Sequence, residues 1–364
     1  MIRRASLLLI GLLALAGSAA PSAGAAYAPP GFFGISPQSA LTEKDVALMQ
    51  IAGITSARLP MNWNAVQPRS RFFYEPDFDG FDHSVRIAAE YGISVLPVLS
   101  NTPDWLAPSP IDLPVATAGQ RWAWKSFVRD AARRYGPNGS FWDENPELPY
   151  VPIRQWEVWN EENIVTFANP ANPESYAVLL RLAGQVLHRF DPGAKVLIGG
   201  FFGRPLQIPP NVSSGGFLSR LYRARRVKRY FDGVALHPYV SDASAMRAQI
   251  ANLRRVMRLH HDAATPLYVT ELGWGSDSGE SRWERGPYGQ ARELDRAFSM
   301  LVRKRRAWRI GGLWWFSWTD ENGSCQFCDS AGLLTSDREA KPAWYRFNAW
   351  TGGDPFVVPR AALE

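Results

Sequence analysis

The sequence predicts an α/β fold, a (β/α)8 TIM barrel that forms a single domain over residues 26–364, after a signal peptide over residues 1–25. Three observations predict it. Short aliphatic or β-branched runs alternate eight times with amphipathic helical patterns, which is typical of parallel strands joined by helical crossovers. No long Pro/Ser/Gly linker divides the chain after residue 30. No G-x-G-x-x-G or P-loop motif follows the first run, which disfavours the rival doubly wound open sheet.

The predicted elements alternate strand by helix along the chain. Strands are expected at 31–36, 54–60, 93–99, 153–160, 195–200, 231–239, 266–271 and 310–318. Helices are expected at 42–52, 81–91, 120–135, 173–190, 217–230, 243–261 and 289–307. The fourth helix has the clearest limits, because Asn172-Pro173 supplies an N-cap and a first-turn proline, and Asp191-Pro192-Gly193 ends it.

The first 25 residues have the features of a secretory signal. Arg3 and Arg4 precede an apolar run over residues 7–16, and Ala23-Gly24-Ala25 fits a cleavage site. The apolar run is shorter than the roughly 20 residues that a membrane span needs. We therefore expect cleavage and a secreted, cell-surface or periplasmic protein without a membrane span; a retained anchor is the alternative.

Composition indicates a globular protein with a mildly basic surface. Apolar residues make up 46% of the chain, and the loss of two arginines with the signal peptide takes the formal charge from +6 to +4. Basic residues cluster in 220–229 and 303–309, on predicted helices, where a solvated outer face is expected and an anionic polymer is the alternative partner. Nucleic acid is not expected, because no recognition motif is present. We expect a monomer without cofactor or metal.

The chain has two cysteines, Cys325 and Cys328, in the segment GSCQFCDS. In a cytosolic protein this C-x-x-C spacing would suggest redox chemistry or half of a zinc site. The export signal indicates an oxidising compartment, and no second pair completes a zinc site. We expect a small disulfide that stiffens a loop.

Polar and aromatic side chains gather where the predicted strands end. In a (β/α)8 barrel the chemistry lies at the C-terminal ends of the strands. The residues at these positions are Arg58, Asn101, Trp105, Asn160, Glu161, His237, Tyr239, Glu271, Trp315 and Trp318.

Glu161 and Glu271 follow the fourth and seventh strands and project toward one barrel mouth. Hydrolysis of a glycosidic bond needs two carboxyl groups, one to protonate the leaving oxygen and one to attack or to activate water. Retaining enzymes hold these groups about 5–5.5 Å apart. Two glutamates on opposite sides of a barrel mouth can meet that distance.

The segments EVWNEEN, VALHPY and VTELGWGS resemble the signature segments of clan A glycoside hydrolases, the cellulase and xylosidase superfamily that contains families 5 and 39. The resemblance extends over about residues 31–350. It implies a retaining β-glycoside hydrolase that acts on O-glycosidic bonds of an oligo- or polysaccharide, with Glu161 as acid/base and Glu271 as nucleophile.

The resemblance also implies roles for the neighbouring residues. Asn160 would bind the sugar 2-hydroxyl, and Arg58 and Tyr239 would orient and ionise Glu271. His237 would shape the same wall. One of the two tryptophans would form the floor under the sugar: Trp315 or Trp318.

Several alternatives remain at this stage. Glu162 is the rival acid, but strand alternation would turn it away, and Glu157, about 13 Å deeper, is expected to be a buried structural carboxylate. Asn101, Trp63 and Trp105 are possible sugar contacts. The whole chain could instead be a non-catalytic carbohydrate-binding barrel at the cell surface, or a basic adhesion protein that uses its arginine runs.

Overall fold

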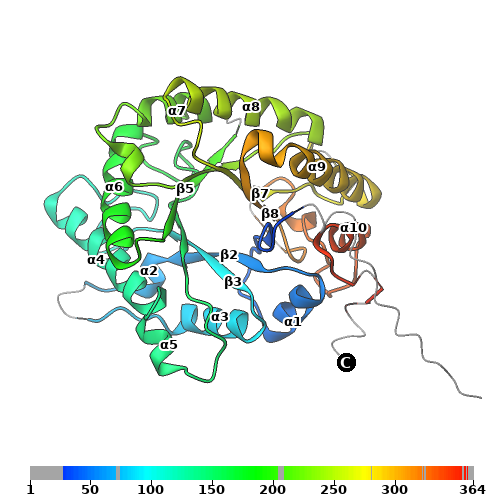
Figure 1. Ribbon diagram of the computed structural model, residues 1–364, viewed down its shortest axis with the longest axis horizontal. Coiled ribbons are helices and arrows are strands. Elements are labelled where there is room, and N and C mark those ends of the chain that lie inside the picture. The colour runs from blue at the N-terminus through cyan, green and yellow to red at the C-terminus, as the bar shows by residue number, and fades with distance from the viewer. Residues whose placement is uncertain are drawn as a thin grey trace, which may run out of the picture.

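The computed structural model describes residues 28–70, 74–203, 209–279, 281–321, 323, 325–354, 356–357 and 359. Eight parallel strands form a closed barrel in chain order, and a ring of helices surrounds it (Figure 1). The predicted fold is therefore confirmed. The strands are β1 (Phe33–Ile35), β2 (Ser56–Asn62), β3 (Ser94–Ser100), β4 (Gln155–Val158), β5 (Lys195–Phe202), β6 (Gly233–His237), β7 (Leu267–Leu272) and β8 (Ile310–Trp315).

The outer layer contains the crossover helices and three further helices. The crossover helices are α1 (Glu43–Ile51), α3 (Asp79–Glu90), α4 (Ala118–Tyr135), α6 (Pro173–Phe190), α7 (Ser214–Leu221), α8 (Ala243–Leu259) and α9 (Pro287–Trp308). The further ones, which the periodicity did not predict, are α2 (Trp63–Val66), α5 (Ser140–Glu144) and α10 (Pro342–Thr351). Side chains satisfy the free N–H groups at several helix starts, as Asn172 does for α6.

All eight strands and seven helices occur where the sequence predicts them, with differences at the ends. β4, β6 and β8 end two or three residues early, so Asn160, Tyr239 and Trp318 lie in loops. The helix predicted over 217–230 ends at Leu221, and a short 3-10 helix follows at Val227–Arg229. The arginine-rich composition of this stretch hides the break, because arginine favours helices.

The core has two layers that are typical of this architecture. Inside the barrel lies a small buried cluster of Leu96, Leu197, Ala235, Tyr268 and Trp314. A much larger cluster fills the space between the strands and the helices, and it contains most of the buried tryptophans. The high tryptophan content therefore serves mainly to pack the two layers, as the density of large aromatic side chains suggests.

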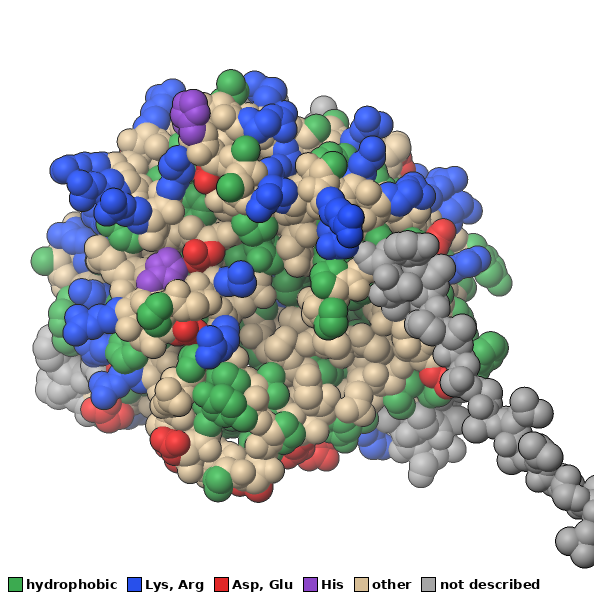
Figure 2. Space-filling model, viewed as in Figure 1, with side chains coloured by type: hydrophobic (Ala, Val, Ile, Leu, Met, Phe, Trp, Pro, Cys, Tyr) green, Lys and Arg blue, Asp and Glu red, His purple; other side chains and the backbone are tan. Residues whose placement is uncertain are grey.

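The surface agrees with the prediction for the basic runs. Arg220, Arg223, Arg303 and Lys304 are exposed on the outer faces of α7 and α9 or just beyond them. In Figure 2, Lys and Arg side chains gather over α7, α8 and α9. The predicted signal peptide lies outside the described residues. Within the described part of the chain, every helix is too short or too polar to cross a membrane.

Candidate active site

Glu271 lies near the end of β7, where two strong donors hold its carboxylate. Arg58 on β2 donates from Nη1 to Glu271 Oε1 at 2.5 Å, and the Tyr239 hydroxyl donates to Oε2 at 2.6 Å. Burial raises the pKa of the Tyr239 hydroxyl well above its usual value, so this group keeps its proton and remains a donor. Both contacts favour the ionised form of the carboxyl group.

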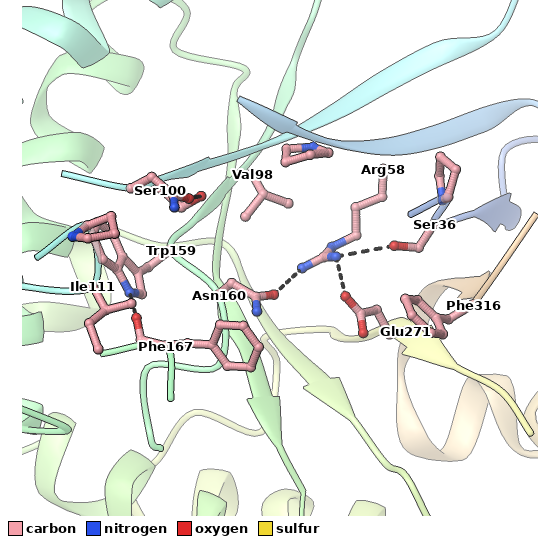
Figure 3. A pocket seen from close by; sticks show the side chains of 14 residues that line it. Ser36, Arg58, Val98, Ser100, Ile111, Trp159, Asn160, Phe167, Glu271 and Phe316 are labelled. Atoms are coloured by element: carbon pink, nitrogen blue, oxygen red, sulfur yellow. Dashed lines mark hydrogen bonds and ion pairs between the residues drawn. The ribbon is translucent and has the colours of Figure 1, made fainter. Parts of the chain in front are cut away.

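Arg58 links four strands beneath the barrel mouth. Its Nε and Nη2 donate to the two oxygens of Glu157 on β4 at 3.0 and 2.9 Å. Nη2 also donates to Asn160 Oδ1 at 2.8 Å, and Nη1 donates to Ser36 at 3.3 Å (Figure 3). The two carboxylates raise the pKa of Arg58, so the guanidinium stays charged although it is buried. This side chain thus fixes Asn160 and Glu271 relative to each other.

Glu161 lies three residues beyond β4, in a tight turn. Its φ is 45°, in the left-handed region, and Trp159 two residues earlier has a φ of 74°. This irregular backbone directs the carboxyl group of Glu161 toward β6, where Oε1 lies 2.7 Å from Nδ1 of the fully buried His237. One carboxylate oxygen of Glu161 and one of Glu271 lie within 4.8 Å of each other. The two glutamates therefore share one site.

The surroundings of the two glutamates differ in charge. Burial raises the pKa of Glu161, the nearby charge of Glu271 raises it further, and the contact with His237 opposes this. Burial raises the pKa of Glu271 too, but there Arg58 and Tyr239 act against it. Burial lowers the pKa of His237, so this ring is neutral at neutral pH. Glu271 has a cation and a hydroxyl donor that favour its ionised form, and Glu161 has neither, so the two carboxyl groups differ in what opposes the effect of burial.

A cavity of about 250 Å³ opens above Glu271 and Asn160 (Figure 3). Its polar lining comes mainly from Ser36, Arg58, Ser100, Asn101, Asn160 and Glu271, and its apolar lining from Pro37, Pro60, Val98, Pro110, Ile111, Trp159, Phe167 and Phe316. Glu161, His237 and Tyr239 do not line this cavity. They approach Glu271 from the side of β4 and β6.

The structure corrects the prediction for Trp315 and Trp318, at and beyond the end of β8. Trp315 is the last residue of β8, and its indole is completely buried against Trp274 and Phe298. Trp318 is also buried and donates from its indole to Asp45 in the first turn of α1. Neither forms the floor of the cavity. Phe316 takes the lining position because side chains alternate along the strand and Trp315 points outward.

Of the three residues predicted as possible sugar contacts after β2 and β3, one lines the cavity and two do not. Asn101 lines the cavity and has a φ of 68°. Trp105 lies away from it, half-buried, with its indole donating to the Gln67 carbonyl at 2.8 Å. Trp63 is fully buried in the core. Of these three residues, only Asn101 is placed to meet a ligand in this cavity.

The remaining glutamates near β4 are buried. Glu157 is the carboxylate that holds Arg58, as the prediction of a structural role requires. Glu162 points away from Glu161, toward Gly199 on β5. A Cβ atom at position 199 would lie only 2.5 Å from Glu162 Oε2. Burial raises the pKa of Glu162 well above its usual value, so it is a neutral acid.

Two contributions to the site are not visible in the sequence. The predicted disulfide between Cys325 and Cys328 is present, and the loop that it closes carries Phe327. The Phe327 ring lies 5.3 Å from the ring of Tyr239 and 6.1 Å from that of Phe316. Only the position of the cysteine pair just after the eighth strand could have suggested that this loop reaches the site.

The second contribution is a wall formed by two loops that pair with each other. Asn169, after β4, donates from its side chain to Asp112, after β3, at 2.7 Å, and its backbone N–H bonds to the Ile111 carbonyl at 2.8 Å. This pairing holds Ile111 and Phe167 along one side of the cavity (Figure 3).

Among the residues that the structure describes, two groups of side chains have spacings that could hold a cation. Glu161, His237 and Glu271 form one, but their ligand atoms already bind Arg58, Tyr239 and each other. Asp277, Glu284 and Asp329 form the other, at a partly exposed position between the loops after β7 and β8.

Comparison with known proteins finds similarity in structure. No family model matches the sequence, and no curated protein matches it. A family 39 glycoside hydrolase from Bacteroides cellulosilyticus WH2 aligns with a TM-score of 0.64 and 19% identity, over 89% of this chain and 64% of that one. The chain thus spans somewhat less than two thirds of that protein.

Two further structures show the same similarity. A monomeric β-xylosidase from Caulobacter crescentus CB15 aligns with a TM-score of 0.61 and 16% identity, over 90% of this chain and 69% of that one. An intracellular xylanase from Thermoanaerobacterium saccharolyticum JW/SL-YS485 aligns with a TM-score of 0.61 and 16% identity, over 91% of this chain and 99% of that one. The chain therefore shares its barrel fold with glycoside hydrolases that include family 39 enzymes.

Proposed function

We propose that this protein is a retaining β-glycosidase that cleaves O-glycosidic bonds of an oligo- or polysaccharide by double displacement. The observation that carries the proposal is the pair of buried carboxyl groups with oxygens within 4.8 Å of each other. That spacing suits a direct attack on the sugar, because an inverting enzyme needs a wider gap, about 6.5–9.5 Å, to admit a water molecule. The fold shared with xylosidases and a xylanase supports the same class of reaction.

In the first step, the Glu271 carboxylate attacks the anomeric carbon. The bond from that carbon to the leaving oxygen breaks while Glu161 transfers its proton to this oxygen. In the second step, Glu161 takes a proton from water, and the resulting hydroxide displaces Glu271 from the anomeric carbon. Glu271 is thus a carboxylate at the start and end of the cycle, as its contacts with Arg58 and Tyr239 favour.

Asn160 and Arg58 prepare the site for the charge that develops in the transition state. Arg58 accepts no hydrogen bond, so its contact with Asn160 Oδ1 fixes which end of the carboxamide faces the cavity. The Asn160 amide N–H₂ is then free to donate to the sugar 2-hydroxyl, a contact that strengthens in the transition state.

The proposal is tested by the stereochemistry of the product. The purified protein is incubated with a panel of 4-nitrophenyl β-glycosides that includes xyloside, glucoside, galactoside and mannoside, and the best substrate is followed by proton NMR. We expect the β-anomer of the released sugar to appear first and to mutarotate later. Initial release of the α-anomer would show an inverting enzyme, and the absence of hydrolysis across aryl glycosides and polysaccharides would favour a binding protein.

A further inference from the structure

A second cavity, of about 340 Å³, adjoins the first at Pro60, which lines both. Its walls come from the loop after β1, the end of β2, the short helix α2 and the start of α3. Pro37 lines the first cavity and the next residue, Gln38, lines the second. The two cavities thus lie next to each other at the mouth of the barrel, over β1 and β2.

The positions of the two glutamates show which end of a substrate each cavity would hold. The sugar that Glu271 attacks must lie over Glu271 and Asn160, which line the first cavity. Glu161 must face the leaving oxygen, and it lies outside this cavity, beside His237 on β6. The second cavity is on the side of β1 and β2, across the barrel from β6, which carries the His237 ring that contacts Glu161. It is therefore on the glycone side, beyond the sugar that is attacked.

The lining of the second cavity has the mixed character that suits a sugar ring. Leu59, Val66 and Phe81 provide apolar surface, and Asn62, Asp77, Asp79 and Ser84 provide polar groups. Asn62 Oδ1 accepts a hydrogen bond from the Ala65 N–H at 3.2 Å, so its amide N–H₂ is the part that can donate to a hydroxyl. The two aspartates can accept hydrogen bonds from sugar hydroxyls.

The charges of this lining limit the class of sugar. Among the described residues, the side chains that line the cavity include two carboxylates and no Lys or Arg. A uronic acid would bring a third negative charge into this space without a cation to offset it. A neutral hexose or pentose meets no such penalty.

We propose that this cavity is a second glycone subsite, which binds a neutral sugar linked to the one that Glu271 attacks. The inference rests on the proposed function and extends it: the enzyme prefers substrates with at least two sugars on the glycone side of the bond that is cut. It would then release a disaccharide or longer unit, or cut within a chain, in preference to removing single terminal sugars.

The test compares matched aryl glycosides that differ by one sugar. For wild-type protein, kcat/KM is measured on 4-nitrophenyl β-xyloside and β-xylobioside, and on the β-glucoside and β-cellobioside pair. Ala65 is exposed on α2 and lines the second cavity, so Ala65→Trp fills it. Ala307→Trp, at an exposed position on α9, is the matched control for the bulk of the new side chain.

We expect the two-sugar substrate of the better pair to exceed its one-sugar partner in kcat/KM by about tenfold or more, equivalent to one or two good hydrogen bonds. Ala65→Trp should bring that ratio close to one, and Ala307→Trp should leave it unchanged. A ratio near one in the wild type, or an unchanged ratio in Ala65→Trp, would overturn the subsite while leaving the glycosidase proposal intact. If wild-type protein cleaves no member of either pair or of the wider panel, the proposed function fails, and this inference fails with it.

Discussion

At the scale of single residues, the two glutamates differ in the groups that surround their carboxyl oxygens. Glu271 has a guanidinium and a hydroxyl donor within 2.6 Å, whereas the group nearest to Glu161 is a buried, neutral imidazole. Both carboxyl groups are buried, so burial alone would keep both of them protonated. The asymmetry of the donors favours ionisation of Glu271 over Glu161, and the proposed roles of nucleophile and acid rest on this asymmetry.

Removal of the Tyr239 hydroxyl tests the role of this donor. The hydrogen bond lowers the pKa of Glu271, so Tyr239→Phe should raise that pKa. A hydrogen bond to a charged group contributes about 1.5–3 kcal/mol, which corresponds to a rise of about one unit or more. Because Glu271 must be ionised to attack, the acid limb of the kcat/KM–pH profile should move to higher pH by that amount. An acid limb that stays in place would show that another group sets it.

Replacement of Glu161 tests the acid. Glu161→Gln keeps the size of the side chain but cannot donate a proton to the leaving oxygen, so turnover of substrates with poor leaving groups should fall by about 10²–10⁴-fold. Substrates with activated aryl leaving groups need little protonation, and azide should restore turnover of these by replacing water in the second step. Glu162→Gln is the control, because Glu162 is buried and points toward Gly199. Loss of activity in the control alone would move the acid role to Glu162.

At the scale of elements, the loops after the strands complete the site. The loop closed by Cys325 and Cys328 holds Phe327 against the ring of Tyr239, and the paired loops after β3 and β4 hold Ile111 and Phe167 beside the cavity. Glu271 thus lies on a strand and Glu161 in the turn just after one, and the longer loops determine the shape of the space above them, as in other proteins of this architecture.

The disulfide loop supports a prediction about stability. In the chain-entropy description, a bridge across so short a loop contributes about 2 kcal/mol. The double substitution Cys325→Ser/Cys328→Ser should therefore lower the free energy of unfolding by about 2 kcal/mol in urea titrations. Wild-type protein treated with a reductant should match the double variant, and a reductant should leave the variant itself unchanged. Equal stability of the oxidised wild type and the variant would contradict a stabilising bridge.

The limits of the prediction from sequence are also clearest at the scale of elements. Periodicity and β-branched runs located all eight strands, and the motifs around Glu161 and Glu271 located both carboxyl groups. The positions of Trp315 and Trp318 could not be predicted from these patterns. The residue at which a strand ends determines which of the following side chains face the cavity, and β8 ends at Trp315, three residues before the predicted end. The contact between Phe327 and Tyr239 joins residues 88 positions apart, and local patterns contain no signal for it.

At the scale of the whole molecule, the closed barrel brings Arg58, Glu157 and Glu271 together from strands that are far apart in the chain. The Arg58–Glu157 pair is almost completely buried, with two hydrogen bonds between the partners. A buried pair of this kind adds little stability compared with apolar side chains, but loss of one partner leaves an unpaired charge in the core. The pair therefore couples the positions of Asn160 and Glu271, which Arg58 also contacts, to the integrity of the barrel.

Substitution of Glu157 tests this coupling. Glu157→Leu leaves Arg58 with one carboxylate in place of two and should lower the free energy of unfolding by about 3–5 kcal/mol, as measured by urea titration. Glu174→Leu, at an exposed position in the first turn of α6, is the matched control: it removes an exposed ion pair with Arg220 and should change the stability by about 1 kcal/mol or less. Similar effects of the two substitutions would show that the buried pair has no special structural role.

The covalent intermediate provides the most direct test of the central claim, that Glu271 attacks the sugar while Glu161 acts on the leaving group. The protein is incubated with the 2-deoxy-2-fluoro derivative of its best aryl β-glycoside, digested with pepsin and analysed by mass spectrometry. The account predicts one added fluorosugar on the peptide that contains Glu271, with loss of activity in step with labelling. A label on Glu161, on Glu157 or on any other residue would contradict it.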